Sequence, residues 1–308
     1  MSDAAHAAER VPVNRPPRWK SRDRWWAAFF LAPQGLGILL FTMVPFAFSF
    51  YLAFHQWNGF GEMTFIGLDG FADQLTDPLF GRAVLNTVII AVVTVPIGLL
   101  LAIWVAVMLN RVRRRAVYLV MFFAPVVTSS VAVALIWQQL LRTDGWLSRV
   151  VAAVLRIDPP DWLNDPHLAL AALCVVTIWS ALGLNVVIFL AGLQNISPSV
   201  LEAAAIDGAG TMRRFWSVTM PLLSPTVFLQ SVIAFISSLQ AFDLVFVLVK
   251  DAGPDNATRT IVYHIYDLGF RQSQLGLSAA AAVFLLLLSV IVTAMQFGVE
   301  KRFVHYDG

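Results

Sequence analysis

Long uncharged apolar runs dominate the pattern of this sequence of 308 residues. A helix needs roughly 20 predominantly apolar residues to cross the hydrocarbon core of a bilayer. Six runs reach that length, and they predict membrane-spanning helices at residues 27–54, 83–109, 117–141, 168–193, 222–249 and 277–298. The pattern therefore predicts an all-α integral membrane protein, with a six-helix domain at 27–298 between tails at 1–26 and 299–308.

The composition supports this class. Hydrophobic residues make up 58% of the chain and charged residues only 13%, whereas soluble domains are about 25% charged. A soluble enzyme is therefore excluded. The single cysteine, Cys174, and five scattered histidines predict neither a disulfide nor a metal site. The formal net charge of +2 is too small to favour nucleic acid as a partner.

The basic residues predict the orientation of the six spans. Fourteen of the 21 Lys and Arg side chains lie in the two tails and in the loops after the second and fourth spans. Basic residues favour the cytoplasmic side, so both termini are expected in the cytoplasm of a cell-membrane protein. The first span is too long for a cleavable signal and should remain in place. Tryptophans near the span ends are expected to anchor the protein at the interface: Trp25, Trp26, Trp57, Trp146 and Trp162.

Two Asp-Pro pairs predict where helices begin. An acid at the N-cap accepts a hydrogen bond from a free backbone N–H of the first helical turn. Proline suits the first helical position, where no backbone donor is needed. Asp165-Pro166 is expected to open the fourth span, and Asp77-Pro78 a short interfacial helix before the second span.

The loop between the fourth and fifth spans, residues 197–221, is the most patterned stretch of the chain. Ser197 is expected to cap a helix that starts at Pro198, and Gly208 permits the turn that ends it. Thr211 is then expected to cap a second short helix that stops before Pro221. The prediction is a compact cytoplasmic helix-turn-helix.

The surface of this loop allows two interpretations on spacing alone. Small residues, Ala203, Ala204 and Gly208, would let the backbone of another protein approach closely, while Phe215 and Trp216 offer an anchor. The alternative is an ordinary amphipathic connection lying on the membrane.

The loop resembles the EAA loop of binding-protein-dependent ABC importer permeases. Glu202-Ala203-Ala204 is followed at the family spacing by Gly208, and then by Val218 and Met220-Pro221. The resemblance implies that Glu202 makes polar contact with a cytoplasmic ATPase subunit and that Gly208 permits the turn. The implied coupling residues are Glu202, Ala203, Ala204, Asp207, Gly208, Phe215 and Pro221.

The likeness covers nearly the whole chain, in the manner of the carbohydrate importers related to the maltose and glycerol-phosphate systems. Phe65-Ile66-Gly67-Leu68, Asn86-Thr87 and Trp162-Leu163-Asn164-Asp165-Pro166 all match familiar patterns, whereas Lys250-Asp251-Ala252-Gly253-Pro254 departs from the usual Thr-Gly-Gly-Pro. The resemblance implies the type I ABC importer permease fold and a sugar or sugar derivative as substrate.

The resemblance also implies partners. They are a second, related permease subunit that completes a heterodimer, an extracytoplasmic solute-binding protein, and two ATPase subunits. This chain has no Gly-x-x-x-x-Gly-Lys-Ser/Thr loop. ATP and Mg²⁺ are therefore expected on the ATPase subunits, and this chain is expected to be a transport subunit rather than an enzyme, with no cofactor of its own.

Polar residues within the spans suggest a translocation path. Asp243 is the single charged residue in any span, and Gln230, Ser237 and Gln240 share an arc of about 140° with it on an ideal helix. This stripe either lines the path or binds a neighbouring helix. Asn185 on the fourth span is a weaker path candidate, because a lone amide more often supports packing.

Two other functions remain as alternatives. An integral membrane transferase would need acids or histidines gathered at one membrane face, but the only neighbouring inner-loop acids, Glu202 and Asp207, are explained by the EAA pattern. A secondary transporter would work without ATP.

Overall fold

The computed structural model describes residues 21–303, which fall into two units with a boundary between Ser49 and Phe50. Most of the predicted N-terminal tail, residues 1–20, and the end of the C-terminal tail, 304–308, lie outside the described residues.

The first unit is an apolar helical segment. It contains α1 (Ser21–Ile38), a π-helical turn (Leu39–Met43) and the start of α2 (Val44–Leu52). Residues Trp25–Leu52 are long and apolar enough to cross a membrane. This agrees with the predicted first span.

The second unit contains four further candidate spans, a fifth if a sharply bent helix pair is counted as one span, and their connections. A two-residue antiparallel hairpin, β1 (His55–Gln56) with β2 (Thr64–Phe65), comes first. The helices that follow are α3 (Asp69–Thr76), α4 (Pro78–Asn110), α5 (Arg115–Val127), α6 (Ser130–Leu141), α7 (Trp146–Leu155), α8 (Pro166–Gln194), α9 (Pro198–Ile206), α10 (Thr211–Arg214), α11 (Met220–Leu239), α12 (Asp243–Leu248), α13 (Ile261–Tyr266) and α14 (Leu275–Phe303).

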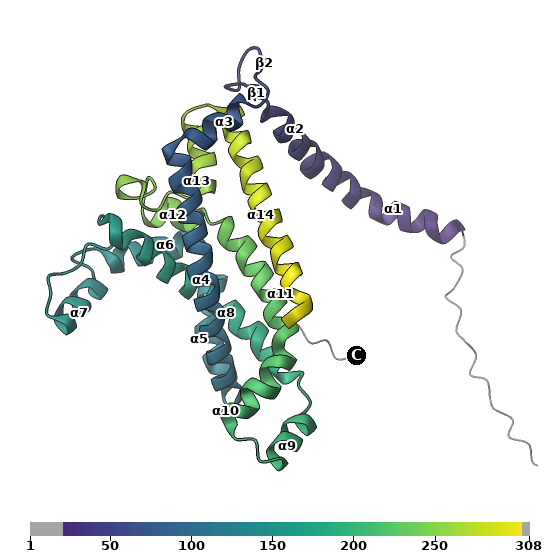
Figure 1. Cartoon of the computed structure of the whole chain (residues 1–308), viewed down its shortest axis with the longest axis vertical. Helices are drawn as coiled ribbons and strands as arrows, with labels where there is room; N and C mark the ends of the chain where they lie inside the picture. Colours follow the sequence, from purple (N-terminus) through teal and green to yellow (C-terminus); the bar gives the residue numbers. More distant parts are fainter. Residues whose placement is uncertain (1–20, 304–308) are drawn as a thin grey trace, which may run out of the picture. The chain divides into compact units, whose positions relative to one another are not determined.

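The core of the second unit lies where α4, α8 and α11 pack together (Figure 1). Ala102 of α4, Phe189 of α8 and Leu223 of α11 are all buried in one apolar cluster. A second cluster joins α6, α8 and α12 through Ala134, Leu173 and Val245. Packing of apolar side chains and close helix contacts hold these helices together, as in other helical membrane proteins.

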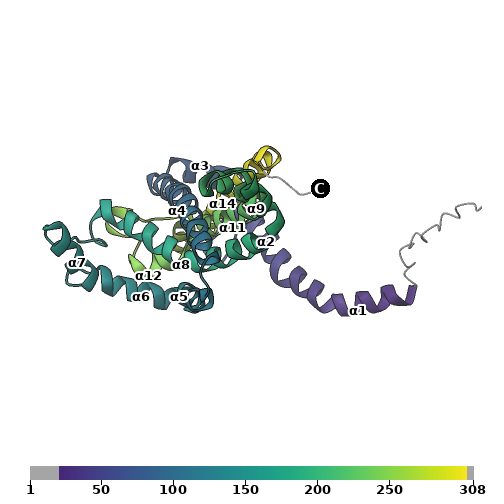
Figure 2. The ribbon, with the colours of Figure 1, turned by 90° about the horizontal axis from the view of Figure 1, so that it is seen from below.

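The loops gather at two opposite ends of the second unit (Figure 1). The hairpin, α3 and α13 lie at one end, and α9 and α10 lie at the other. Figure 2 shows α7 at the edge of the unit that is remote from α14. Helices that cross the membrane therefore separate two distinct loop surfaces.

The fourth span and its capping signal are confirmed. α8 begins at Pro166, and the Asp165 carboxylate accepts a hydrogen bond of 2.7 Å from the backbone N–H of His167. The predicted helix at Asp77-Pro78 is wrong in one respect. Asp77 caps the long α4 itself, accepting from the Leu79 N–H at 2.8 Å, and the separate short helix is the preceding α3.

The third predicted span, 117–141, is not one straight helix. α5 and α6 meet at a bend of 100°. Pro125 lies in the last turn of α5, where it removes a backbone donor, and Thr128 after it has extended geometry. The length of an apolar run carries no information about a change in helix direction, so the sequence did not predict the bend.

The fifth predicted span, 222–249, is also wrong as a continuous helix. α11 ends at Leu239, and the chain leaves helical geometry at Phe242 before α12 starts at Asp243. At its other end the helix extends further than predicted, because α10, a π-helical turn and α11 together form the candidate span Thr211–Leu239. The short helix expected to stop before Pro221 therefore continues through that proline, which occupies the first turn of α11.

Candidate functional site

The loop between α8 and α11 forms the predicted helix and turn. α9 begins at Pro198, after Ser197, whose hydroxyl contacts Ser199 Oγ at 2.8 Å rather than capping the backbone. Gly208 has a φ of +77°, a region that side-chain-bearing residues rarely adopt. An added Cβ would have open space. Backbone conformation, not crowding, therefore requires glycine at this turn.

Two predicted coupling residues meet beneath α9. Glu202 and Phe215 line one cavity of about 400 Å³, together with Arg111 from the end of α4 and Arg214 of α10. Within residues 25–300, Glu202 forms no ion pair. Its carboxylate is exposed beside two guanidinium groups and is free to accept hydrogen bonds from a partner.

The remaining coupling candidates do not line this cavity. Ala203, Asp207 and Gly208 are exposed, and Ala204 is half-buried. Pro221 is half-buried in the first turn of α11. The loop thus presents small residues and two exposed carboxylates, those of Glu202 and Asp207. It lies at one end of the unit (Figure 1).

The predicted polar stripe is not one helical face. The arc requires a continuous helix from Gln230 to Asp243, but α11 ends at Leu239. Ser237 and Gln240 are exposed at the end of α11, and Asp243 is exposed at the first position of α12. These three path candidates therefore surround a helix break instead of lining a straight helix.

Asn185 lies in a different environment. It is buried on α8, and its Oδ1 accepts a hydrogen bond of 2.5 Å from Nε2 of Gln230 on α11, which is also buried. A second contact, 3.4 Å between the Thr94 and Ser238 hydroxyls, joins α4 to α11. Asn185 therefore joins two helices in this structure.

Gln138 binds the carboxyl end of α12. Its Nε2 donates to the carbonyls of Val247 and Leu248, both at 3.2 Å. The last carbonyls of a helix have no partner within the helix, so this side chain satisfies groups that would otherwise be costly to bury. This contact joins α6, which follows the bend after α5, to α12, which follows the break after α11.

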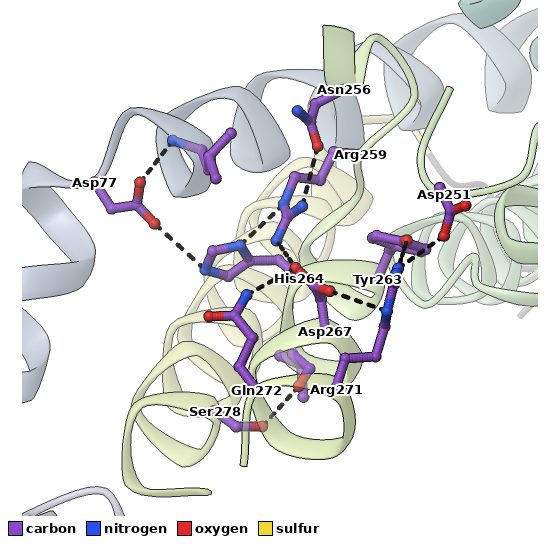
Figure 3. Close-up of polar contacts among 12 residues, drawn as sticks. Asp77, Asp251, Asn256, Arg259, Tyr263, His264, Asp267, Arg271, Gln272 and Ser278 are labelled. Carbon is purple, nitrogen blue, oxygen red and sulfur yellow. Dashed lines mark hydrogen bonds and ion pairs between the residues drawn. The ribbon is translucent and has the colours of Figure 1, made fainter. Parts of the chain in front are cut away.

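A polar cluster that the sequence did not predict surrounds α13 (Figure 3). Arg259 and Asp267 form an ion pair of 2.6 Å, in which the Arg259 side chain is buried and the Asp267 side chain is 13% exposed. The Arg259 Nε also donates to His264 Nδ1 at 3.1 Å. Because arginine is always a donor, His264 Nδ1 must be an acceptor and the imidazole is neutral.

The same cluster connects α13 to α3 and α4. His264 Nε2 donates to Gln74 Oε1 at 2.9 Å. Asn86 Nδ2 donates to the Arg259 carbonyl at 3.0 Å, and Thr87 Oγ1 accepts from the Ile261 N–H at 2.9 Å. We call Gln74, Asn86, Thr87, Arg259, His264 and Asp267 the α13 polar cluster. It fixes the long connection between α12 and α14 to the start of α4.

Burial, and then the charge of the neighbouring Arg259, lower the pKa of His264 to about 4 against the opposing carboxylates of Asp77 and Asp267. Beside the cluster, the exposed Arg271 donates to Asp251 at 2.8 Å and to the Tyr263 hydroxyl at 3.0 Å (Figure 3). Burial raises the pKa of Tyr263. Among the described residues, no group of three His, Cys, Asp or Glu side chains is arranged to hold a metal.

From the sequence alone, Arg259 is only one of the basic residues of an outer loop. Its partners in the structure are His264 and Asp267, five and eight residues away along the chain, and Asn86 of α4, 173 residues away. The Asn86-Thr87 pair was noted, but only as a resemblance. A histidine, an acid and an arginine within a short apolar segment, Arg259 to Asp267, was the available signal.

Known proteins share both the sequence pattern and this fold. The profile of the family described as "Binding-protein-dependent transport system inner membrane component" matches residues 82–305. The lactose transport system permease protein LacF of Rhizobium radiobacter is 33% identical over 87% of this chain and 91% of its own length. The sn-glycerol-3-phosphate transport system permease protein UgpA of Brucella abortus is 33% identical, with coverage of 91% and 96%.

A solved structure has the same fold. A chain of a bacterial ABC transporter involved in the import of the acidic polysaccharide alginate superposes with a TM-score of 0.82 at 22% identity, over 92% of this chain and 98% of that chain. Five candidate spans, or six with the bent α5–α6 pair, and the loop surfaces described above thus define a membrane component of a transport system. The chain belongs to the family of binding-protein-dependent transport system inner membrane components, as a permease subunit and not an enzyme.

Proposed function

We propose that this permease subunit imports a carbohydrate or sugar derivative and couples to a separate cytoplasmic ATPase through the α9–α10 loop. The observation that carries the coupling is the protruding α9, where Gly208 makes a left-handed turn and Glu202 lies exposed without an ion pair within the described chain. The pattern of small residues beside exposed carboxylates suits close docking of another protein.

Replacement of Glu202 tests the coupling. We expect Glu202→Ala to weaken co-purification of the ATPase subunit and to lower transport, because a charge-assisted contact contributes about 1.5–3 kcal/mol. The matched control is Glu62→Ala, which removes an exposed carboxylate from the hairpin connection at the opposite end. Equal ATPase recovery in the Glu202 and Glu62 variants would contradict the proposal.

The substrate class rests on the relatives, whose names refer to lactose and to sn-glycerol-3-phosphate. We expect uptake of a sugar-type solute in proteoliposomes that contain the complete complex, solute-binding protein and ATP. Omission of the ATPase subunits should abolish uptake. Uptake that persists without them would identify a secondary transporter instead.

The substrate path in this proposal passes the break between α11 and α12. Ser237, Gln240 and Asp243 are exposed there, and their hydroxyl, amide and carboxylate groups suit the hydroxyls of a sugar. Asn185 contributes by fixing α8 to α11 through Gln230. In this proposal Asn185 therefore supports the path by joining two helices and does not itself contact the substrate.

Asp243→Asn tests the path, because it removes a charge while volume barely changes. We expect the variant to assemble at the wild-type level but to transport with an altered rate or KM. Asp158→Asn, an exposed acid in the loop before α8, is the control and should have no effect. Normal transport by the Asp243 variant would remove this residue from the path.

The proposed complex has four membrane-associated subunits. A second, related permease chain forms a heterodimer with this one, and two ATPase subunits bind ATP and Mg²⁺ on the cytoplasmic side. An extracytoplasmic solute-binding protein delivers the substrate to the surface formed by the hairpin, α3 and the α13 region. Both termini of this chain lie in the cytoplasm, on the side of α9.

A further inference from the structure

Helix α7 exposes an apolar face that the described chain does not cover. Trp146, Val150 and Val154 recur at intervals of four residues, so they lie within about 80° of one another on the helix. Their exposed fractions are 69%, 37% and 74%. A stripe of this kind is costly in water, because it leaves a large aromatic and two branched side chains hydrated.

The opposite face of α7 is bound to the rest of the protein. Ser148 is fully buried, and its Oγ accepts a hydrogen bond of 3.1 Å from Trp162 Nε1. Leu147 packs against the apolar cluster that joins α6, α8 and α12. The helix therefore cannot rotate to bury its exposed stripe without breaking these contacts.

The turn before α7 fixes its direction. The Gly145 N–H donates to the Arg142 carbonyl at 2.8 Å. A Cβ at Gly145 would lie within 2.8 Å of three backbone carbonyl oxygens, so no larger residue fits this turn unchanged. α7 is held at a set angle to α6.

The apolar surface of α7 continues that of a membrane helix. α6 belongs to the bent third candidate span and ends only four residues before α7 begins. Leu135 and Ile136 of α6 are also exposed. Both views place α7 at the edge of the unit, remote from α14 (Figure 1, Figure 2). With ten residues, α7 is about 15 Å long and too short to cross a bilayer.

Basic side chains flank the exposed stripe. Arg149 lies about 60° from Trp146 around the helix, and Arg156 follows the last turn. Both are exposed, and neither forms an ion pair within residues 25–300. Tryptophan with neighbouring arginines is the combination that favours the boundary between acyl chains and phosphate groups.

We propose that α7 is an interfacial helix whose Trp146–Val150–Val154 face lies in the outer boundary of the bilayer, with Arg149 and Arg156 on phospholipid phosphates. The occupant of the apolar face is lipid, because the face continues the lipid-exposed surface of α6 and carries the charge that complements a phosphate layer. α7 thereby supports α6 and the end of α12 from the membrane surface. This role is independent of the solute that is transported.

Nitroxide depth measurements on the full-length chain test the proposal. The single cysteine is replaced by Cys174→Ala, and one cysteine at a time is introduced as Trp146→Cys, Val150→Cys or Val154→Cys. The labelled proteins are reconstituted in vesicles of phosphatidylethanolamine and phosphatidylglycerol. Collisions with apolar oxygen and with a water-soluble nickel chelate are then compared. Asp158→Cys provides an aqueous reference, and Ala134→Cys, at a fully buried position of α6, provides a protein-buried reference.

We expect all three stripe positions to collide more with oxygen than with nickel, while the label at 158 shows the reverse. Arg149→Gln combined with Arg156→Gln should shift the label at 150 towards water. Stripe labels that resemble position 158 would overturn the proposal, because the face would then be hydrated. Stripe labels that are shielded from both reagents, as the label at position 134 should be, would also overturn the proposal, because protein would then cover the face. An unchanged depth in the double arginine variant would contradict the phosphate contacts.

Discussion

At the scale of single residues, burial decides what an ion pair contributes. Arg259 and Asp267 pair at 2.6 Å with little of either side chain exposed, whereas Arg142 and Asp144 pair at 2.9 Å with more than half of each side chain exposed. Exposed pairs contribute about 0–1 kcal/mol, since water screens them. Removal of one partner from a buried pair leaves an uncompensated charge, which costs several kcal/mol.

Arg259→Met should therefore destabilise the protein by about 3 kcal/mol, because Asp267 keeps only the hydrogen bond from Gln272 and the longer contact with Arg271. Arg142→Met is the matched control and should change stability by about 1 kcal/mol or less. Thermal unfolding of the purified variants in one detergent measures both. Equal unfolding temperatures would show that burial does not strengthen the Arg259 pair.

His264 makes the stability of the α13 polar cluster depend on pH. Its folded pKa of about 4 lies below the ordinary 6.5, so the unfolded chain binds a proton first as the pH falls. The stabilisation is complete above pH 6.5 and is lost progressively down to about pH 4, by up to about 3 kcal/mol. Unfolding temperatures measured from pH 7 to pH 4 should fall less steeply for His264→Gln than for the wild type. Parallel curves would rule out His264 as the cause.

At the scale of elements, helices approach most closely where a glycine allows it. A Cβ at Gly183 of α8 would lie 2.0 Å from the Phe122 carbonyl oxygen of α5. The backbones of the two helices are therefore in direct contact, as small residues permit in membrane proteins.

Gly183→Ala should separate α5 from α8 and destabilise the protein by about 1–3 kcal/mol. Gly98→Ala in α4 is the control. The nearest atom to its added methyl, Ile178 Cγ2, lies at an ordinary 3.9 Å, and alanine favours a helix over glycine by up to about 1 kcal/mol. Expression level and unfolding temperature should fall for the first variant and hold or rise for the second. A fall in both variants would indicate a general intolerance of these helices to added volume.

Some helix boundaries could be predicted from neighbouring residues in the sequence, whereas others could not. Asp165 before Pro166 and Gly208 after an Ala-rich stretch act within a few residues, so the sequence alone identifies a helix start and a turn. The bend between α5 and α6 follows Pro125, and the break before Asp243 follows Ser237, Ser238 and Gln240. Both lie within runs that are apolar enough on average to be predicted as one helix, so a hydropathy average does not register them.

At the scale of the whole molecule, charge asymmetry predicts that α9 lies on the cytoplasmic side and α13 on the other. The candidate coupling loop could be found from sequence because its residues are contiguous. The α13 polar cluster could not, because α3, α4 and α13 supply its members from distant positions. Its assembly requires the folded arrangement of the helices.

Labelling of single cysteines in whole cells tests the orientation. In a Cys174→Ala background, Lys250→Cys should react with a membrane-impermeant maleimide added outside, because Lys250 is exposed beyond α12. Met212→Cys, exposed on α10, should react only after the cells are opened. The reverse result would place α9 outside the cell and exclude its contact with an ATPase.

The α13 polar cluster also determines the order in which the chain can finish folding. Its contacts join residues 170 to 190 positions apart, so Gln74, Asn86 and Thr87 acquire these partners only after α13 has been synthesised. During elongation the start of α4 therefore carries amide and hydroxyl groups that await a late segment. A nascent chain that stalls before Arg259 leaves these groups unsatisfied, and it presents membrane proteases with an incompletely closed loop surface.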